Sequence, residues 1–110
     1  MRVIDIHGPA DESFVGVART AAVAFASSAG LPIDQCDELR LALHEACGLL
    51  LGAHAVEVTF VENDMSLRMS LRPSEPVDCR LSPQSALVLE TMTDRFFLAE
   101  DGMITLEKLL

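Results

Sequence analysis

The sequence VEVTFVENDMSLRMSL, residues 56–71, decides the fold of this chain. Apolar and polar side chains alternate at both of its ends, over 56–61 and over 65–71, which is the spacing of strands with one buried face. The three residues between these runs, Glu62-Asn63-Asp64, have the composition of a turn. We therefore expect an antiparallel hairpin in which each strand buries one face.

Two amphipathic helices are predicted before this hairpin. From Asp11 to about residue 29, apolar side chains recur every three or four positions, with Asp11 and Glu12 in the first turn. Gly30 is a natural C-terminal cap for this helix. A second helix is predicted to begin with Asp34 as its N-cap and to run to about Leu51, with one leucine-rich side.

The rest of the chain completes a helix-covered sheet. The remaining predicted elements are a strand over 2–6, a proline-containing loop over 72–83, a helix over 84–92, and strands over 95–98 and 103–106. This order of elements predicts an α/β two-layer sandwich, with about three helices packed on one face of a mixed, mainly antiparallel sheet.

Composition and charge restrict the function. The chain has 110 residues, of which 50% are hydrophobic, so we expect a single folded domain over 1–110. A formal net charge of -9 and the lack of Trp and Tyr disfavour nucleic acid, because phosphates are repelled and few rings are available for stacking. The acidic surface favours a basic protein partner, or is simply a solvated face.

The same sequence indicates a cytoplasmic protein that contacts no membrane. No apolar run approaches the roughly 20 residues of a membrane span, and the first residues lack the apolar core of a signal peptide. Three cysteines without CxxC spacing indicate neither a disulfide framework nor a zinc knuckle, and they fit a reducing compartment.

Few side chains are arranged for catalysis or metal binding. His44, Glu45 and His54 lack any metal-ligand spacing, so no metal is expected. Cys47 falls on the apolar side of the second predicted helix and is expected to be a core residue. Ser82 has no glycine elbow beside it, so nucleophilic catalysis has no support.

Four segments resemble one protein family. Residues 17–25 (VARTAAVAF) and 39–47 (LRLALHEAC) resemble the first two helices of the anti-sigma-factor serine kinases of the SpoIIAB and RsbW type. Residues 87–95 (LVLETMTDR) and 104–108 (ITLEK) resemble the last helix, the Asp-containing turn and the final strand of the same family. These kinases belong to the GHKL (histidine-kinase-like) ATPase superfamily, so the resemblance implies a reduced Bergerat fold.

The resemblance also implies that the nucleotide site is degenerate. Glu45 stands at the position of the family's catalytic Glu, and is either a relic base or a helix carboxylate that pairs with a neighbour or faces solvent. Leu49 replaces the Asn that coordinates magnesium, and Pro73 replaces the Asp that reads adenine. The glycine boxes are lost, because no glycine lies between Gly52 and Gly102. We therefore expect no cofactor and no catalytic residue.

The partner surface of the family is the part that this chain retains. Arg19 stands at the position of the family's partner-contacting arginine, which is also typical of a solvated or salt-bridged helix residue. With Glu12, Thr20 and Asp34 it forms the expected partner-binding set. The resemblance implies a transcription regulator that binds a sigma factor or a STAS-type anti-anti-sigma factor without ATP, and an acidic protein would attract a basic region of such a partner.

Other readings of the resemblance stay open. One is an ATP-dependent serine/threonine protein kinase that binds Mg-ATP in an atypical site. Another is a scaffold that forms a heterodimer with a full-length member of the family. The resemblance also implies a homodimer, because the family tends to dimerise, and the unpaired edge of the N-terminal strand offers a route for it.

Overall fold

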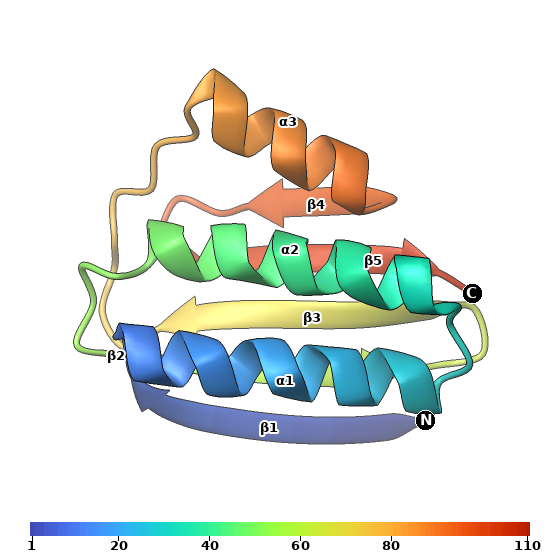
Figure 1. The fold of residues 1–110 in the computed structure, drawn as a ribbon. Coiled ribbons are helices and arrows are strands. Elements are labelled where there is room, and N and C mark those ends of the chain that lie inside the picture. The colour runs from blue at the N-terminus through green and yellow to red at the C-terminus, as the bar shows by residue number, and fades with distance from the viewer.

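A five-stranded sheet carries all three helices on one of its faces (Figure 1). The structure is a computed structural model that describes residues 1–110. Its elements are β1 (Arg2–Pro9), α1 (Glu12–Ser28), α2 (Ile33–Leu49), β2 (Ala55–Glu62), β3 (Ser66–Pro73), α3 (Pro83–Met92), β4 (Arg95–Leu98) and β5 (Ile104–Leu109). The predicted two-layer α/β arrangement is thus confirmed. None of the helices has the length and apolar character needed to cross a membrane.

The expectation of a mixed sheet is wrong, because every neighbouring pair of strands is antiparallel. The strand order is β1-β2-β3-β5-β4. The segment that contains α3 carries the chain from β3 to β4, which runs in the same direction as β3. The tight reversal after β4 then inserts β5 between those two strands, so the parallel strands are never neighbours.

The predicted hairpin is present, and the two helices before it cover the sheet. Asp11 caps α1 by accepting a hydrogen bond from the Phe14 amide at 2.9 Å, and Gly30 follows α1 with a φ of 93°. The prediction of Asp34 as an N-cap is wrong. Pro32 occupies the N-cap position of α2 in an extended conformation, so Asp34 lies inside the first turn, where its charge interacts favourably with the helix dipole.

The N-terminal strand is longer than the sequence indicates. The strand predicted over 2–6 extends through Gly8 and Pro9, which pair with Val56 and Ala55 of β2. The amide of Ala10 donates to the carbonyl of His54, so even-numbered residues of β1 direct their backbone groups toward β2. Pro9 is therefore tolerated, because its missing N–H belongs to the outer edge of the sheet.

The core lies between the sheet and the helices. Alternate side chains of the strands point into it, as predicted, and the largest almost fully buried side chains come from the central strands and α2. They include Leu39 and Leu43 of α2, Phe60 of β2, Leu71 of β3 and Leu106 of β5. Lys108 lies at the border of this core and forms an ion pair with Glu38 of α2.

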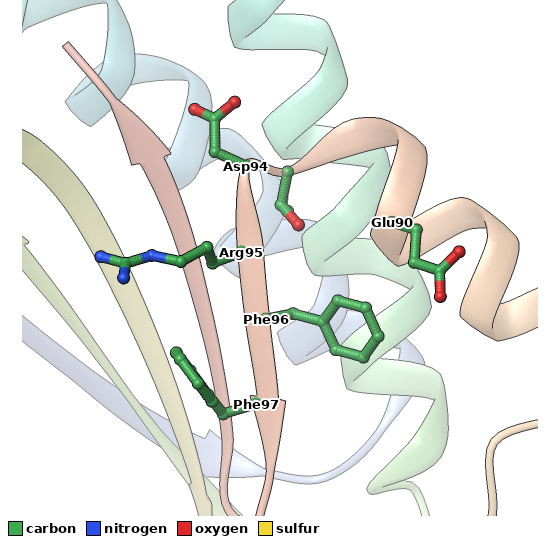
Figure 2. A pocket seen from close by; sticks show the side chains of 6 residues that line it. Glu90, Asp94, Arg95, Phe96 and Phe97 are labelled. Carbon is green, nitrogen blue, oxygen red and sulfur yellow. The ribbon is translucent and has the colours of Figure 1, made fainter.

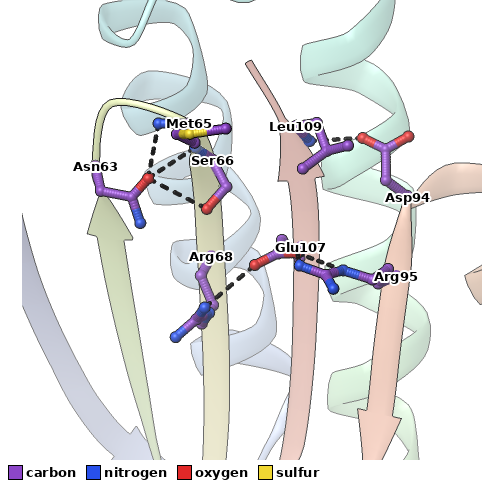
Figure 3. Close-up of polar contacts among 8 residues, drawn as sticks. All are labelled: Asn63, Met65, Ser66, Arg68, Asp94, Arg95, Glu107 and Leu109. Atoms are coloured by element: carbon purple, nitrogen blue, oxygen red, sulfur yellow. Dashed lines mark hydrogen bonds and ion pairs between the residues drawn. The ribbon is translucent and has the colours of Figure 1, made fainter.

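The other face of the sheet is uncovered and carries a chain of ionic contacts. Glu107 of β5 is 2% exposed and lies between Arg68 of β3 and Arg95 of β4 (Figure 3). Its carboxylate accepts a hydrogen bond from Arg68 at 3.2 Å and one from the Nε of Arg95 at 2.6 Å. Burial acts to raise the pKa of Glu107, but the bonds and charges of Arg95 and Arg68 outweigh it and lower the pKa overall.

Replacement of this carboxylate is expected to weaken the fold. Because a Glu with a lowered native pKa stabilises the folded state above its unfolded pKa, Glu107→Gln should lower the free energy of unfolding at pH 7 by about 1–3 kcal/mol. The loss relative to the unmodified protein should shrink as the pH falls below the ordinary value of 4.5.

Urea denaturation at several pH values measures this difference. Glu57→Gln is the matched control, because Glu57 is an exposed carboxylate of β2 on the same open face and should change stability by less than about 0.5 kcal/mol. An equal, pH-independent loss in both variants would contradict the role assigned to Glu107.

Candidate interaction surface

Arg19 lies in the groove between α1 and α2. It comes from the middle of α1 and is half-buried, and its guanidinium contacts the ring of His44 on α2, with Nη1 and Nδ1 3.3 Å apart. A guanidinium has only hydrogen-bond donors, so in this contact the Nδ1 of His44 is the only atom that could accept a hydrogen bond.

A second arginine lies beside the first. Arg40 is one helical turn before His44 on α2, so the two side chains share a face of that helix. Arg19 and Arg40 line a surface hollow of about 340 Å³, together with Gly16, Thr20 and Val23 of α1. We call these five residues and His44 the Arg19 surface.

The charge of Arg19 is not neutralised within the chain. Of the eight Lys and Arg side chains, six form ion pairs with carboxylates: Arg2, Arg40, Arg68, Arg80, Arg95 and Lys108. Arg19 and Arg72 form none, although the chain has 17 acidic residues. Arg72 is an exposed residue of β3 on the open face of the sheet, whereas Arg19 lies in a hollow. Arg19 is thus an unpaired cation in a concave site.

The four sequence-predicted partner residues do not form one cluster. Thr20 lies in the hollow with Arg19, and its hydroxyl donates to the carbonyl of Gly16 at 3.1 Å. Glu12 is exposed at the start of α1, about 10 Å along the helix from Arg19. Asp34 is exposed in the first turn of α2, about 15 Å along that helix from His44.

Four members of this surface lie outside the sequence-predicted partner set: Gly16 and Val23 of α1, and Arg40 and His44 of α2. From the sequence, Arg40 has no assigned role and His44 is considered only as a metal ligand. Arg40 and His44 are four residues apart, so they lie on one side of α2, and this spacing can be read from the sequence. Which residue of α1 lies opposite them depends on how far one helix slides along the other, and periodicity does not define that.

Glu45 is held by a residue of α3. Its carboxylate accepts a hydrogen bond from the Ser85 hydroxyl at 2.6 Å, and Ser85 is buried. Ser85 also receives a hydrogen bond from Ser82, the N-cap of α3. Of the readings given for Glu45 from the sequence, pairing with a neighbour is the one that matches this contact.

Leu49 and Pro73, which the resemblance aligns with the nucleotide site of the anti-sigma-factor kinases, are in packed surroundings. Leu49 is half-buried at the end of α2, where its carbonyl accepts a hydrogen bond from the Cys79 thiol at 3.4 Å. Pro73 is buried at the end of β3. The segment over 74–82 packs Val77, Cys79 and Leu81 against the core. This segment therefore lies over the end of α2 as a packed connection.

Cys47 lies in the core, and the potential metal-ligating side chains do not gather in one place. Cys47 is 3% exposed, which confirms it as a core residue. Burial raises the pKa of the Cys47 thiol to about 12, although the charge of Arg19 acts in the opposite direction. No three side chains among the His, Cys, Asp and Glu residues form a group that could hold a metal ion.

A separate cavity of about 260 Å³ lies beside the edge strand β4 (Figure 2). Glu90 lines it from α3, and Asp94, Arg95, Phe96 and Phe97 line it from β4 and the residue before it. Phe96 projects toward the helices, while Arg95 and Phe97 project from the other side of the strand. Asp94 and Arg95 are already bonded to β5 residues, so the charged groups here support the sheet.

Comparison with known proteins adds no relative. No protein-family model matches the chain, and no curated protein matches it. The resemblance to the anti-sigma-factor serine kinases therefore remains a sequence-based prediction.

The three cysteines are expected to differ in reactivity. At pH 8 a thiol with a pKa of about 12 is ionised in only about one molecule in ten thousand, so Cys47 should resist iodoacetamide in the native protein. Cys79 is partly exposed and should be alkylated first, and Cys36 and Cys47 should react only after denaturation. Peptide mass spectrometry over a time course measures the order, and labelling of Cys47 as fast as Cys79 would contradict it.

Proposed function

We propose that this chain is a regulatory protein-binding domain that controls transcription by holding a sigma factor or a STAS-type anti-anti-sigma factor, without using ATP. The observation that carries the proposal is the unpaired charge of Arg19 in a hollow of the helix layer. The class of partner, the reduced Bergerat fold and a cytoplasmic location follow from the family resemblance and are parts of the same proposal.

The Arg19 surface suits an acidic side chain of a partner protein. A guanidinium can bind a carboxylate through two parallel hydrogen bonds, and Arg19 uses one of its donors on His44 alone. Arg40 is close enough to line the same hollow, and its pairing with Asp37 is a long contact of 3.5 Å between partly exposed groups. A docked Asp or Glu would therefore meet two arginines. The net charge of -9 would at the same time attract basic regions elsewhere on the partner.

The surroundings of Glu45, Leu49 and Pro73 support binding without ATP. Leu49 offers no oxygen ligand for magnesium, and Pro73 has no carboxylate for an adenine base. Glu45 would be the base of a kinase, but its carboxylate is engaged by Ser85. The packed segment over 74–82 occupies the part of the chain in which the family has its glycine boxes and lid.

The proposal predicts no binding of nucleotide. Isothermal titration of the purified protein with Mg-ATP, and separately with Mg-ADP, should give no heat of binding in the micromolar range. Binding of either nucleotide tighter than high-micromolar would overturn the ATP-independent function and would favour the alternative, a serine/threonine kinase with an atypical site. Ser85→Ala serves as a second sample, because it frees the Glu45 carboxylate without filling space.

The proposal also predicts that partner capture depends on Arg19. Co-purification from the native host should recover a sigma factor or a STAS-type protein, and biolayer interferometry with that purified partner then gives a Kd. Arg19→Glu should raise the Kd at least tenfold, because it places a carboxylate where the partner's acidic group binds. Recovery of a kinase-like protein instead would favour the scaffold reading.

Two further variants separate a lost contact from a lost fold. Gly16 has open space around its Cα, so Gly16→Leu should fill the hollow and weaken capture, while the gain in helix propensity of about 1 kcal/mol keeps the protein folded. Arg72→Glu is the matched control, because Arg72 is the other unpaired arginine but lies on the open face of the sheet. If the Arg19→Glu and Arg72→Glu variants bind the partner with the same Kd, the partner binds outside the Arg19 surface.

A further inference from the structure

The strand β4 ends the sheet on the side opposite β1, and no strand pairs with its outer side (Figure 1). The amide of Ala99, directly after β4, donates to the carbonyl of Met103 on the β5 side. Because backbone direction alternates along a strand, the amides and carbonyls of Phe96 and Leu98 point outward. Such an edge is a template for another strand, and β4 contains neither the Lys nor the Pro that commonly protects one.

The cavity of about 260 Å³ beside this edge contains an unused carboxylate. Glu90 lines the cavity from α3, is exposed, and forms no ion pair within the chain. In Figure 2 it lies on the same side of β4 as the ring of Phe96. The cavity is smaller than the roughly 300–1,000 Å³ of ligand pockets, so it suits one long side chain better than a whole ligand. A Lys or Arg side chain there would meet both the carboxylate and the aromatic ring.

We propose that the outer edge of β4 binds an extended, basic segment of another protein, which adds a sixth strand antiparallel to β4 and places a Lys or Arg side chain in the cavity between Phe96 and Glu90. This interaction does not depend on the proposed function, because it uses the edge of β4 and not the Arg19 surface.

The charges around β4 favour a basic occupant. Asp94 precedes the strand, Glu100 and Asp101 follow it in the tight reversal, and all three are exposed. Arg95 is the only cation of β4, and Glu107 already holds it on the open face of the sheet. Both ends of the edge are therefore acidic, as is the chain as a whole. A basic segment would be attracted to this edge, whereas two β4 edges would repel each other.

The pleat of β4 defines the side chains that fit. In an antiparallel ladder, directly opposite residues place their side chains on the same face. The residues opposite Phe96 and Leu98 therefore face the helix layer, and the residue between them faces the open side beside Phe97, which is 58% exposed. Leu87 is 64% exposed and lies three residues before Glu90 on α3, so it shares a side of that helix with the carboxylate. An apolar residue opposite Leu98, an aromatic one opposite Phe97 and a basic one opposite Phe96 match these surroundings.

Titration of the ¹⁵N-labelled protein with a synthetic peptide, followed by NMR, tests the docking. The peptide is acetyl-Lys-Thr-Val-Tyr-Arg-Thr-Thr-amide, in which Val, Tyr and Arg are designed to lie opposite Leu98, Phe97 and Phe96. We expect saturable amide shifts with a Kd below about 1 mM. Glu90→Gln should raise this Kd at least fivefold. Glu12→Gln is the matched control, because it makes the same change in net charge at an exposed helix position on α1, and it should alter the Kd less than twofold.

Two N-methylated peptides separate strand addition from simple charge attraction. A methyl group on the Arg amide removes the hydrogen bond to the carbonyl of Phe96 and should raise the Kd at least tenfold. A methyl group on the Tyr amide points away from β4 and should raise it less than threefold. The absence of saturable binding, equal effects of the two methyl groups, or equal Kd values for the Glu90→Gln and Glu12→Gln variants would overturn the proposal.

Hydrogen exchange in the presence of the unmethylated peptide reads the location of the added strand. The amides of Phe96 and Leu98 should exchange more slowly when the peptide is bound, because both acquire a hydrogen-bond acceptor. The outward amides of Val3, Asp5 and His7, on the opposite edge of the sheet, are the internal control and should exchange at an unchanged rate. Slower exchange on β1 with none on β4 would show that the peptide adds to the other edge, and would overturn the proposal.

Discussion

The apolar layer between the sheet and the helices α1 and α2 is the constraint on which the rest of the structure depends. Leu39 and Leu43 meet Phe60, Leu71 and Leu106 there, and burial of each such side chain contributes about 1.5–3 kcal/mol. A single ion pair stabilises the folded chain by less than the burial of several such side chains together. Because only one face of the sheet is covered, every second residue of a strand lies in this layer and its neighbours face solvent.

The properties of Arg19 follow from that layer. Its neighbours Ala18 and Ala22 are fully buried, so the helix α1 lies close to the structure beneath it and cannot rotate without exposing apolar surface. Arg19 is therefore held at the border with α2, where the facing residue is His44 and not a carboxylate. An arginine in this position remains charged and incompletely bonded, and its side chain is partly fixed before any partner arrives, which lowers the entropy lost on binding.

The spacing of apolar residues in the sequence indicates each helix and strand, but it says little about how these elements pack against one another. Alternation over 56–71 and helical spacing around Arg19 predicted the secondary structure, since one buried face imposes both patterns. Strand ends at Pro9 and Pro73 could not be predicted, because whether a proline fits depends on which edge of the strand its missing N–H faces. The bond between Glu45 and Ser85 joins residues 40 positions apart and depends on the packing of α2 against α3.

The pairing of β1 with β2 has a consequence for the order in which the chain folds during synthesis. Arg2 pairs with Glu62, so β1 leaves the ribosome before its neighbour and lacks it until β2 and the α1–α2 pair have been made. At roughly 5–20 residues per second this takes several seconds, during which the apolar sides of both helices have no sheet to cover. The second half of the chain, by contrast, contains two local hairpins that form quickly. The nascent first half is therefore the part of this protein that would benefit most from a chaperone.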